Sequence, residues 1–148
     1  MGGESNPIDS VGIIMHHTLT RSMLLCLAFI TTPAVMAEGS VARALFASDI
    51  LDREPIDELG DVIKVEYGEI QRVYFFTDLR EMDGSQVSHV WKLNGEVEAE
   101  VSFDIGGDRW RIWSTKRLMP GFDGKWSVDV VKDGEVLETR SFDYVDEW

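Results

Sequence analysis

The sequence predicts an all-β protein, an antiparallel and immunoglobulin-like β-sandwich of about seven to eight short strands, preceded by a signal peptide helix. Three observations lead to this prediction. Short runs rich in Val, Ile, Phe and Trp alternate with polar residues, which is the pattern of half-buried strands. Gly-containing turns separate these runs. No helical periodicity persists beyond about residue 60.

The expected strands follow one another closely along the chain. Eight strands within about a hundred residues are typical of a sandwich. Residues 41–52, where Ala and Leu dominate, could instead form one or two helical turns. The expected strands are residues 41–48, 61–67, 72–79, 86–93, 96–105, 109–116, 124–131 and 135–144.

The first segment of the chain has the features of a secretory signal peptide. A basic residue precedes the apolar run 23–30, and small residues end at Ala37, after which we expect cleavage. The run is shorter than the ~20 residues that a membrane helix needs, although an uncleaved anchor is the alternative. Acidic residues before Met15 suggest that Met15 is the true start. We therefore expect a signal peptide over 1–37, a single sandwich domain over 38–148, and a periplasmic or secreted product.

The charge balance excludes several classes of function. The 148 residues include 14 Lys+Arg against 27 Asp+Glu, a formal net charge of −13. Nucleic-acid binders and polybasic membrane-surface proteins need a basic surface, so neither class fits. The single cysteine, Cys26, lies in the expected signal peptide, which leaves no thiol for a disulfide or a zinc site. The acidic stretch 78–84 matches no EF-hand loop, and we expect no metal and no cofactor.

Two-residue turns set the expected register of the strands. Asn94-Gly95 is the strongest hairpin signal, and Gly106-Gly107 predicts a second hairpin. A third hairpin, around Asp133-Gly134, is expected to contain a β-bulge because apolar pairs interrupt its alternation. The first two hairpins predict one core face and one polar face. The core face would carry Val90, Val97, Ala99, Val101, Phe103, Trp110 and Ile112, and the polar face His89, Trp91, Glu98, Glu100, Asp104, Arg109, Arg111 and Trp113.

The expected polar face is the candidate binding site. Ladder pairs of carboxylates and arginines, with the arginines stacked on tryptophans, would be an ordinary structural use of such residues. Flat Trp rings flanked by Arg, His and carboxylates also suit a sugar, a peptide or a partner protein, since Trp and Arg are favoured interface anchors. The candidate binding residues are His89, Trp91, Glu98, Glu100, Arg109, Arg111 and Trp113.

Few residues in this sequence are suited to catalysis. His89 is the only histidine after residue 37, and no serine lies in a Gly-x-Ser-x-Gly elbow. His89 could act as a pH sensor or an acid–base group beside Glu100, but a lone strand histidine more often has a hydrogen-bonded structural role. The paired carboxylates of Glu98 and Glu100 leave a small carboxylate-dependent hydrolase as an alternative. We expect no enzyme activity and identify no catalytic residue.

A compact polar box follows the first apolar run. It consists of Arg53, Glu54, Pro55 and Asp57, and the proline favours extended geometry at Glu54. A turn held by a salt bridge is the expected structure of this box, and a recognition loop is the alternative.

Seven short boxes stand in a recognisable order and spacing. They are Ala42-Arg-Ala-Leu-Phe46, Arg53-Glu-Pro-x-Asp57, Val73-Tyr-Phe-Phe-Thr77, His89-Val-Trp91, Arg109-Trp-Arg-x-Trp-Ser-x-Lys116, Gly124-Lys-Trp-Ser-Val128 and Gly134-x-Val-Leu137. Over about residues 41–145 the chain resembles the bacterial family known as domain of unknown function 2914. The resemblance implies an exported or extracytoplasmic domain, often joined to membrane segments, and it implies no activity. Unlike membrane-linked members, this chain is expected to have no membrane span after signal cleavage.

The sequence as a whole predicts an exported bacterial β-sandwich of unknown molecular function, a non-catalytic binding or interaction module of the cell envelope. A carbohydrate- or peptidoglycan-binding module is the first alternative, and a small carboxylate-dependent hydrolase is the second. The expected partner is a protein or glycan of the envelope, and not a nucleic acid.

Overall fold

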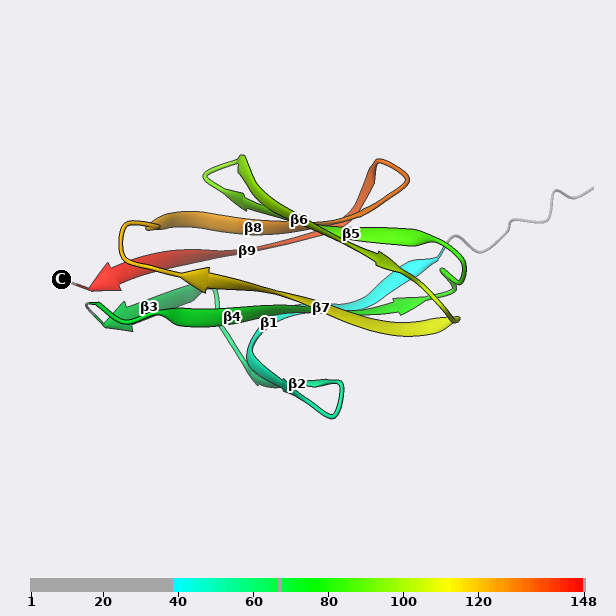
Figure 1. The fold of residues 1–148 in the computed structure, drawn as a ribbon, viewed down its shortest axis with the longest axis horizontal. Coiled ribbons are helices and arrows are strands. Elements are labelled where there is room, and N and C mark those ends of the chain that lie inside the picture. The colour runs from blue at the N-terminus through cyan, green and yellow to red at the C-terminus, as the bar shows by residue number, and fades with distance from the viewer. Residues whose placement is uncertain (1–38, 67, 148) are drawn as a thin grey trace, which may run out of the picture. The chain divides into compact units, whose positions relative to one another are not determined.

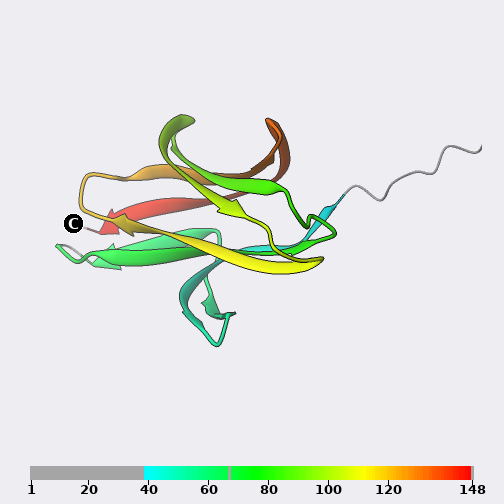
Figure 2. The same ribbon diagram turned by 45° about the vertical axis from the view of Figure 1, so that its right-hand side comes forward.

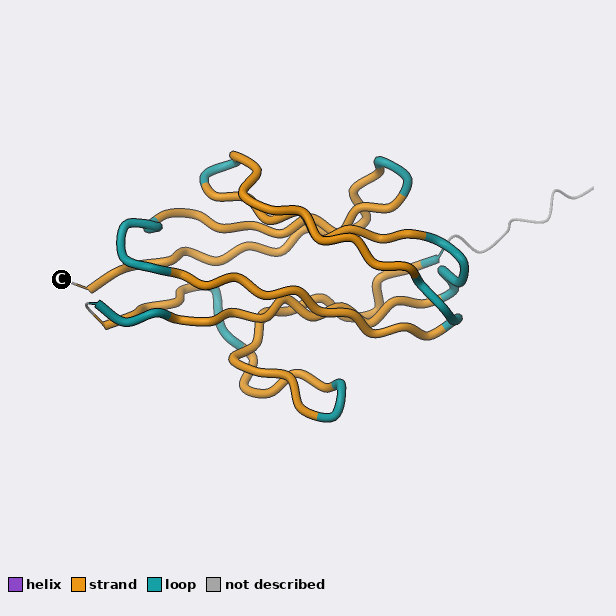
Figure 3. Tube along the Cα trace, in the orientation of Figure 1, coloured by secondary structure: helices purple, strands orange, loops and turns teal. Residues whose placement is uncertain are grey.

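The computed structural model describes residues 39–66 and 68–147, in which all regular structure is β-strand (Figures 1 and 3). The predicted signal peptide, residues 1–37, lies outside the described residues. The strands of the described part are β1 (Ser40–Leu51), β2 (Glu54–Glu58), β3 (Val62–Glu66), β4 (Gln71–Arg80), β5 (Gln86–Leu93), β6 (Glu96–Asp104), β7 (Arg109–Leu118), β8 (Gly124–Lys132) and β9 (Glu135–Glu147).

These strands form two sheets that face each other as the layers of a sandwich (Figures 1 and 2). The four-stranded sheet has the order β2-β1-β4-β7, and the five-stranded sheet has the order β3-β9-β8-β5-β6. Neighbouring strands are antiparallel, except that β3 and β9 are parallel. The predicted all-β sandwich is confirmed, with nine strands in the described residues where seven to eight were expected.

The additional strand is β2, which lies where the sequence predicted a turn. Residues 40–51 form one continuous strand and no helical turn. The chain then reverses at Asp52 and Arg53, whose φ angles are 50° and 64°. Two successive residues with positive φ are typical of a type I′ hairpin turn, which usually contains glycine at its second position. Because Arg53 occupies that position, the sequence carried no glycine signal for this hairpin.

The Asn94-Gly95 hairpin is confirmed, but the register beyond it differs from the prediction. Both turn residues have positive φ, 49° and 87°. The register shifts between Trp91 and Lys92: Lys92 pairs with Val97 and Trp91 pairs with Ala99, which leaves Glu98 as an extra, unpaired residue in β6. One inserted residue moves every later side chain of a strand to the opposite face. The predicted face assignment of β5 relative to β6 is therefore wrong.

The consequence is an exchange of core and surface residues. His89 and Trp91, which were expected on the polar face, are fully buried. Val97 and Val101, which were expected in the core, are 62% and 37% exposed. The bulge thus turns the aromatic side of β5 towards the sandwich interior.

The Gly106-Gly107 segment does not form the predicted hairpin. β6 pairs with β5 in one sheet and β7 pairs with β4 in the other, so this segment crosses between the sheets. Backbone hydrogen bonds hold the crossing: the Ile105 N–H donates to the Ser85 carbonyl (2.9 Å), and the Gly84 N–H donates to the Ile105 carbonyl (2.8 Å). Burial of the Ile105 side chain anchors the same point. A turn signal alone does not distinguish a hairpin from such a crossing.

The third predicted hairpin is confirmed together with its bulge. Asp133 and Gly134 have φ angles of 52° and 78°. The pairing of β8 with β9 shifts register between Val130 and Val131, which is where apolar pairs interrupt the alternation. This hairpin continues the five-stranded sheet.

Aromatic side chains from both sheets fill the interior. Phe46 and Phe75 of the four-stranded sheet lie 6.1 and 6.3 Å from Trp91, measured between ring centroids. Trp126 lies 6.4 Å from Trp91 in a tilted edge contact, and Phe142 packs edge-on against Phe46 at 4.7 Å. Large buried rings of this kind contribute most of the apolar area that stabilises a small sandwich.

Candidate functional site on the four-stranded sheet

The outer face of the four-stranded sheet concentrates arginine side chains. Val73, Phe75 and Leu79 of β4 belong to the core, so the alternate residues of β4 point to the other side of the sheet. Side chains directly opposite on neighbouring strands share a face. The register pairs are Arg43↔Asp78, Arg72↔Arg117, Asp78↔Arg111 and Arg80↔Arg109. We call the surface formed by Arg43, Arg72, Arg80, Arg109, Arg111 and Arg117 the arginine face; it holds six of the nine arginines of the chain.

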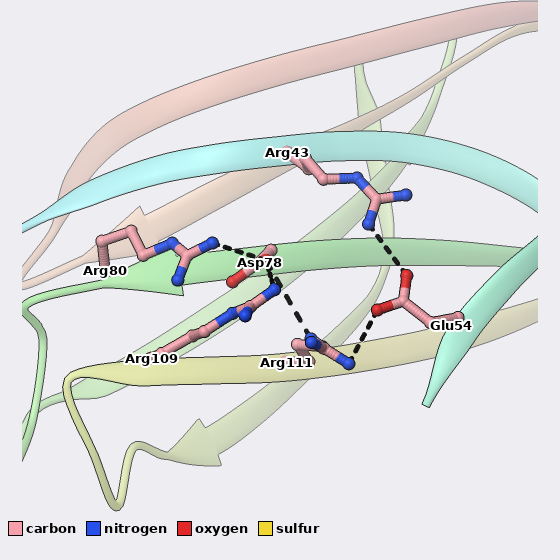
Figure 4. A network of polar contacts seen from close by, with 6 residues as sticks. All are labelled: Arg43, Glu54, Asp78, Arg80, Arg109 and Arg111. Carbon is pink, nitrogen blue, oxygen red and sulfur yellow. Dashed lines mark hydrogen bonds and ion pairs between the residues drawn. The ribbon is translucent and has the colours of Figure 1, made fainter. Parts of the chain in front are cut away.

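Asp78 is the centre of one half of this face. Its side chain is fully buried, and its Oδ2 accepts hydrogen bonds from Arg80 (3.0 Å) and Arg109 (3.2 Å) (Figure 4). The Arg111 Nε lies 4.0 Å from the same oxygen. Asp78 Oδ1 has no hydrogen-bond partner among the described residues. Asp78 is thus a buried carboxylate surrounded by three guanidinium groups, which supply the opposite charge that a buried ionic side chain needs.

Glu54 supplies a second carboxylate from the β1–β2 hairpin, which projects from the sheet in Figures 1 and 2. Its two oxygens contact Arg43 (2.9 Å) and Arg111 (2.7 Å), as Figure 4 shows. The hydrogen bond from Arg43, with the nearby charges of Arg111 and Arg109, lowers the pKa of Glu54 although partial desolvation raises it. Glu54 is 44% exposed, so these contacts add little stability and can exchange with an incoming anion.

Aromatic rings underlie the cationic groups. The guanidinium carbon of Arg43 lies 5.1 Å from the centre of the Phe76 ring, and that of Arg53 lies 5.7 Å from Trp110. Trp113 pairs with Phe76 across β4 and β7 and is half-buried. A depression of about 250 Å³ beside these groups is lined by Arg53, Phe103, Trp110, Arg111, Ile112 and Trp113. Arg and Trp side chains in this arrangement are common anchors of binding surfaces.

The structure separates the seven residues that were predicted to form one binding site. Arg109, Arg111 and Trp113 lie on the outer side of the four-stranded sheet. Glu98 and Glu100 lie on β6 at the edge of the five-stranded sheet, and Glu98 is 4.0 Å from Lys116. The predicted single polar face is wrong, because the bulge in β6 and the crossing after it place these strands in different sheets. His89 and Trp91 lie in the core.

The polar box has a different structure from the expected turn. Glu54, Pro55 and Asp57 lie in β2, and Arg53 lies in the turn that precedes it. Asp57 Oδ2 accepts a long hydrogen bond from the Ser48 hydroxyl (3.4 Å). The expected salt bridge is present at Glu54, where it joins β2 to β1 and β7.

His89 has the structural role that the sequence favoured. Its Nε2 lies 3.1 Å from the Thr77 hydroxyl, and its Nδ1 lies 2.9 Å from the Ser114 hydroxyl. The Trp91 indole N–H also donates to Ser114 Oγ (2.9 Å). Burial lowers the pKa of His89 to about 3. The imidazole is therefore neutral near pH 7 and is enclosed by the core, so it is not placed to exchange protons with a substrate.

Several residues of the arginine face were not singled out from the sequence. The alternation of Arg72, Asp78 and Arg80 in β4 is a signal that could have found them. This alternation is hard to recognise in the sequence because β4 is a central strand, and residues on both of its faces, Phe76, Thr77 and Asp78, are buried. The acidic stretch 78–84, which was compared above with an EF-hand loop, begins inside a strand, because Asp78 lies in β4 and pairs with arginines.

The described residues contain neither a metal-binding cluster nor a membrane-spanning helix. No group of three or more His, Cys, Asp or Glu side chains in residues 39–66 and 68–147 is arranged to hold a metal ion. That part of the chain also contains no helix of the length and hydropathy needed to cross a bilayer.

Comparison with solved structures places the chain in the class of immunoglobulin-like sandwiches. An immunoglobulin-like protein from Pseudomonas aeruginosa superposes with a TM-score of 0.50 at 10% sequence identity, over 75% of this chain and 99% of the other. The CARDB domain of a Pyrococcus furiosus protein, solved in complex with di-metal ions, has a TM-score of 0.48 at 14% identity, over 74% of this chain and 92% of that one. At 10% identity, the likeness to the Pseudomonas aeruginosa protein concerns the fold alone.

The family follows from a separate comparison. Residues 84–144, from just before β5 into β9, match the family model described as "Protein of unknown function (DUF2914)". The match confirms the resemblance that the sequence boxes indicated, over a shorter range than the expected 41–145. No curated protein sequence matches the chain.

Proposed function

We propose that this domain is a non-catalytic binding module of the bacterial cell envelope, exported by the N-terminal signal segment, and that its arginine face binds an acidic partner. The observation that supports this proposal is the segregation of charge. A chain of net charge −13 places six arginines on one side of one sheet, where only the carboxylates of Asp78 and Glu54 form ion pairs with them among the described residues.

The size and shape of the arginine face favour a large partner. Arg72 and Arg80 are eight residues apart on β4, which corresponds to about 26 Å at ~3.3 Å per residue. A row of guanidinium groups of this length fits an extended acidic segment or a protein surface better than a small molecule. Guanidinium groups bind carboxylates through paired hydrogen bonds, which give the contact a defined geometry.

Retention of the full chain on immobilised poly-L-glutamate tests the proposal. We expect retention that weakens as salt rises and that falls in the variant Arg109→Gln. The matched control is Arg140→Gln, because Arg140 lies on β9 of the other sheet and is as exposed as Arg109 (54% against 53%). Unretained wild-type protein, or equal losses in both variants, would contradict the proposal.

An acidic glycan is the alternative partner. The same chain is passed over polygalacturonate and over neutral dextran. Stronger retention on polygalacturonate than on polyglutamate would favour the glycan, whereas retention on dextran would show that charge does not direct the binding.

A further inference from the structure

A hollow lies at the end of the arginine face that is far from Asp78. Its volume is about 330 Å³, and it is lined by Arg72, Thr115, Lys116, Arg117, Met119 and Phe122. Three of these side chains are cationic and none is acidic. The hollow therefore combines positive charge with an apolar wall.

The apolar wall is a rigid turn that the sequence specifies. In Met119-Pro-Gly-Phe122, proline occupies the second position and Gly121 takes a φ of +88° at the third, as a type II turn requires. The Phe122 N–H donates to the Met119 carbonyl (3.1 Å), which closes the turn. The indole N–H of buried Trp126 donates to the Phe122 carbonyl (3.0 Å), and the two rings pack edge to face at 6.3 Å. The wall is thus fixed to the core before any ligand arrives.

The two arginines of the hollow differ from the rest of the arginine face, whereas its lysine, Lys116, lies 4.0 Å from Glu98. Arg72 and Arg117 lie directly opposite each other on β4 and β7. Like charges at such a position are destabilising. Neither side chain forms an ion pair within residues 39–66 and 68–147, whereas the other four arginines of the face all contact Asp78 or Glu54. Two guanidinium groups about 5 Å apart at their bases match one carboxylate between them.

From this geometry we infer that the hollow binds a carboxylate that stands next to an apolar side chain on an acidic polypeptide. The inference rests on the proposed function, and it adds the class of partner and the point of recognition. Arg72 and Arg117 take the carboxylate, while Met119, which is 39% exposed, and Phe122 contact the apolar group. Methionine and phenylalanine are typical of protein interfaces, which favours a polypeptide over a glycan.

Two labelled decapeptides test the inference by fluorescence anisotropy with the full chain. One contains nine glutamates and a central leucine, and the other has serine in place of the leucine. We expect the leucine peptide to bind about tenfold more tightly, since partial burial of one leucine side chain contributes on that order. The variant Met119→Gln should reduce this preference to less than about threefold, and Arg117→Gln should weaken binding of both peptides.

The comparison variant is Arg109→Gln, at the other end of the face. It should weaken both peptides equally and keep the preference for leucine. If the wild type binds both peptides equally and Arg109→Gln weakens both, the hollow does not recognise the apolar group, and the proposed function stands without it. If the wild type binds neither peptide, both proposals fail. Thermal unfolding of each variant, compared with the wild type, shows whether a loss of binding comes from a loss of fold.

Discussion

His89 allows a quantitative prediction about stability and pH. In the folded protein its pKa is about 3 because burial disfavours the imidazolium, whereas an unfolded histidine titrates near pH 6.5. Between these two values the unfolded chain binds one more proton at this site than the folded chain. The free energy of unfolding therefore decreases as pH falls through 6.5, by about 1.4 kcal/mol for each pH unit, and this stability is fully present above pH 6.5.

The variant His89→Leu isolates this contribution. Leucine leaves the Thr77 hydroxyl without the imidazole partner, so the variant should be less stable at pH 7.5 by about 1–3 kcal/mol. Its stability should nevertheless depend less on pH. Between pH 6.5 and 5.0 the wild type is expected to lose about 2 kcal/mol more than the variant, from the slope of ~1.4 kcal/mol per pH unit.

Urea unfolding followed by tryptophan fluorescence measures both slopes. The window above pH 5 is chosen because Glu54 and Asp129, whose pKa values lie below their ordinary values, change protonation at lower pH. Contributions of other groups cancel in the difference between the two proteins. Equal slopes for wild type and variant would refute the reasoning, as would an NMR titration of the folded His89 ring with a midpoint near pH 6.5.

Three further predictions concern the site and the turns. Asp78→Ala removes the buried carboxylate that accepts two charge-assisted hydrogen bonds, and the two arginine donors, 36% and 53% exposed, can be rehydrated in the variant. We expect urea denaturation to show that the free energy of unfolding falls by about 3 kcal/mol. The control Asp83→Ala, at an exposed position, should change the free energy of unfolding by less than ~0.5 kcal/mol. Asn94 has a positive φ, and its side-chain oxygen accepts a hydrogen bond from the Lys125 N–H at 3.0 Å. Asn94→Ala should therefore lower the free energy of unfolding by about 2 kcal/mol, more than Asp133→Ala does at the other confirmed turn. Glu54→Gln removes one negative charge from the arginine face and should raise retention on poly-L-glutamate, with reduced retention as the contrary result.

The strand pattern was accurate because it depends on local chemistry. Period-two alternation and turn residues located eight strands to within a few residues, and the Asn94-Gly95 and Asp133-Gly134 turns adopt the positive φ angles that their sequences favour. β2 was not predicted because Arg53 occupies the turn position at which a glycine usually indicates a hairpin.

The faces were predicted poorly because they depend on counting residues across a strand pair. One bulge residue at Glu98 reversed the assignment of β5 relative to β6. The crossing at Gly106-Gly107 then separated the residues of β6 from those of β7. Arg109, Arg111 and Trp113 were correctly predicted to share a face, because they alternate on the single strand β7 and their placement does not depend on the register between strands.

By itself, the sequence determined an all-β sandwich, two of its hairpin turns, its likeness to the DUF2914 family and its acidity, because each of these follows from composition or from residues close together in the chain. The tertiary structure alone decided that six arginines share one face. Those residues come from β1, β4 and β7, which are distant in the sequence and are brought together by long-range pairing. It also decided that His89 and Trp91 lie in the core, since a single inserted residue in β6 is enough to choose which side of a strand meets water.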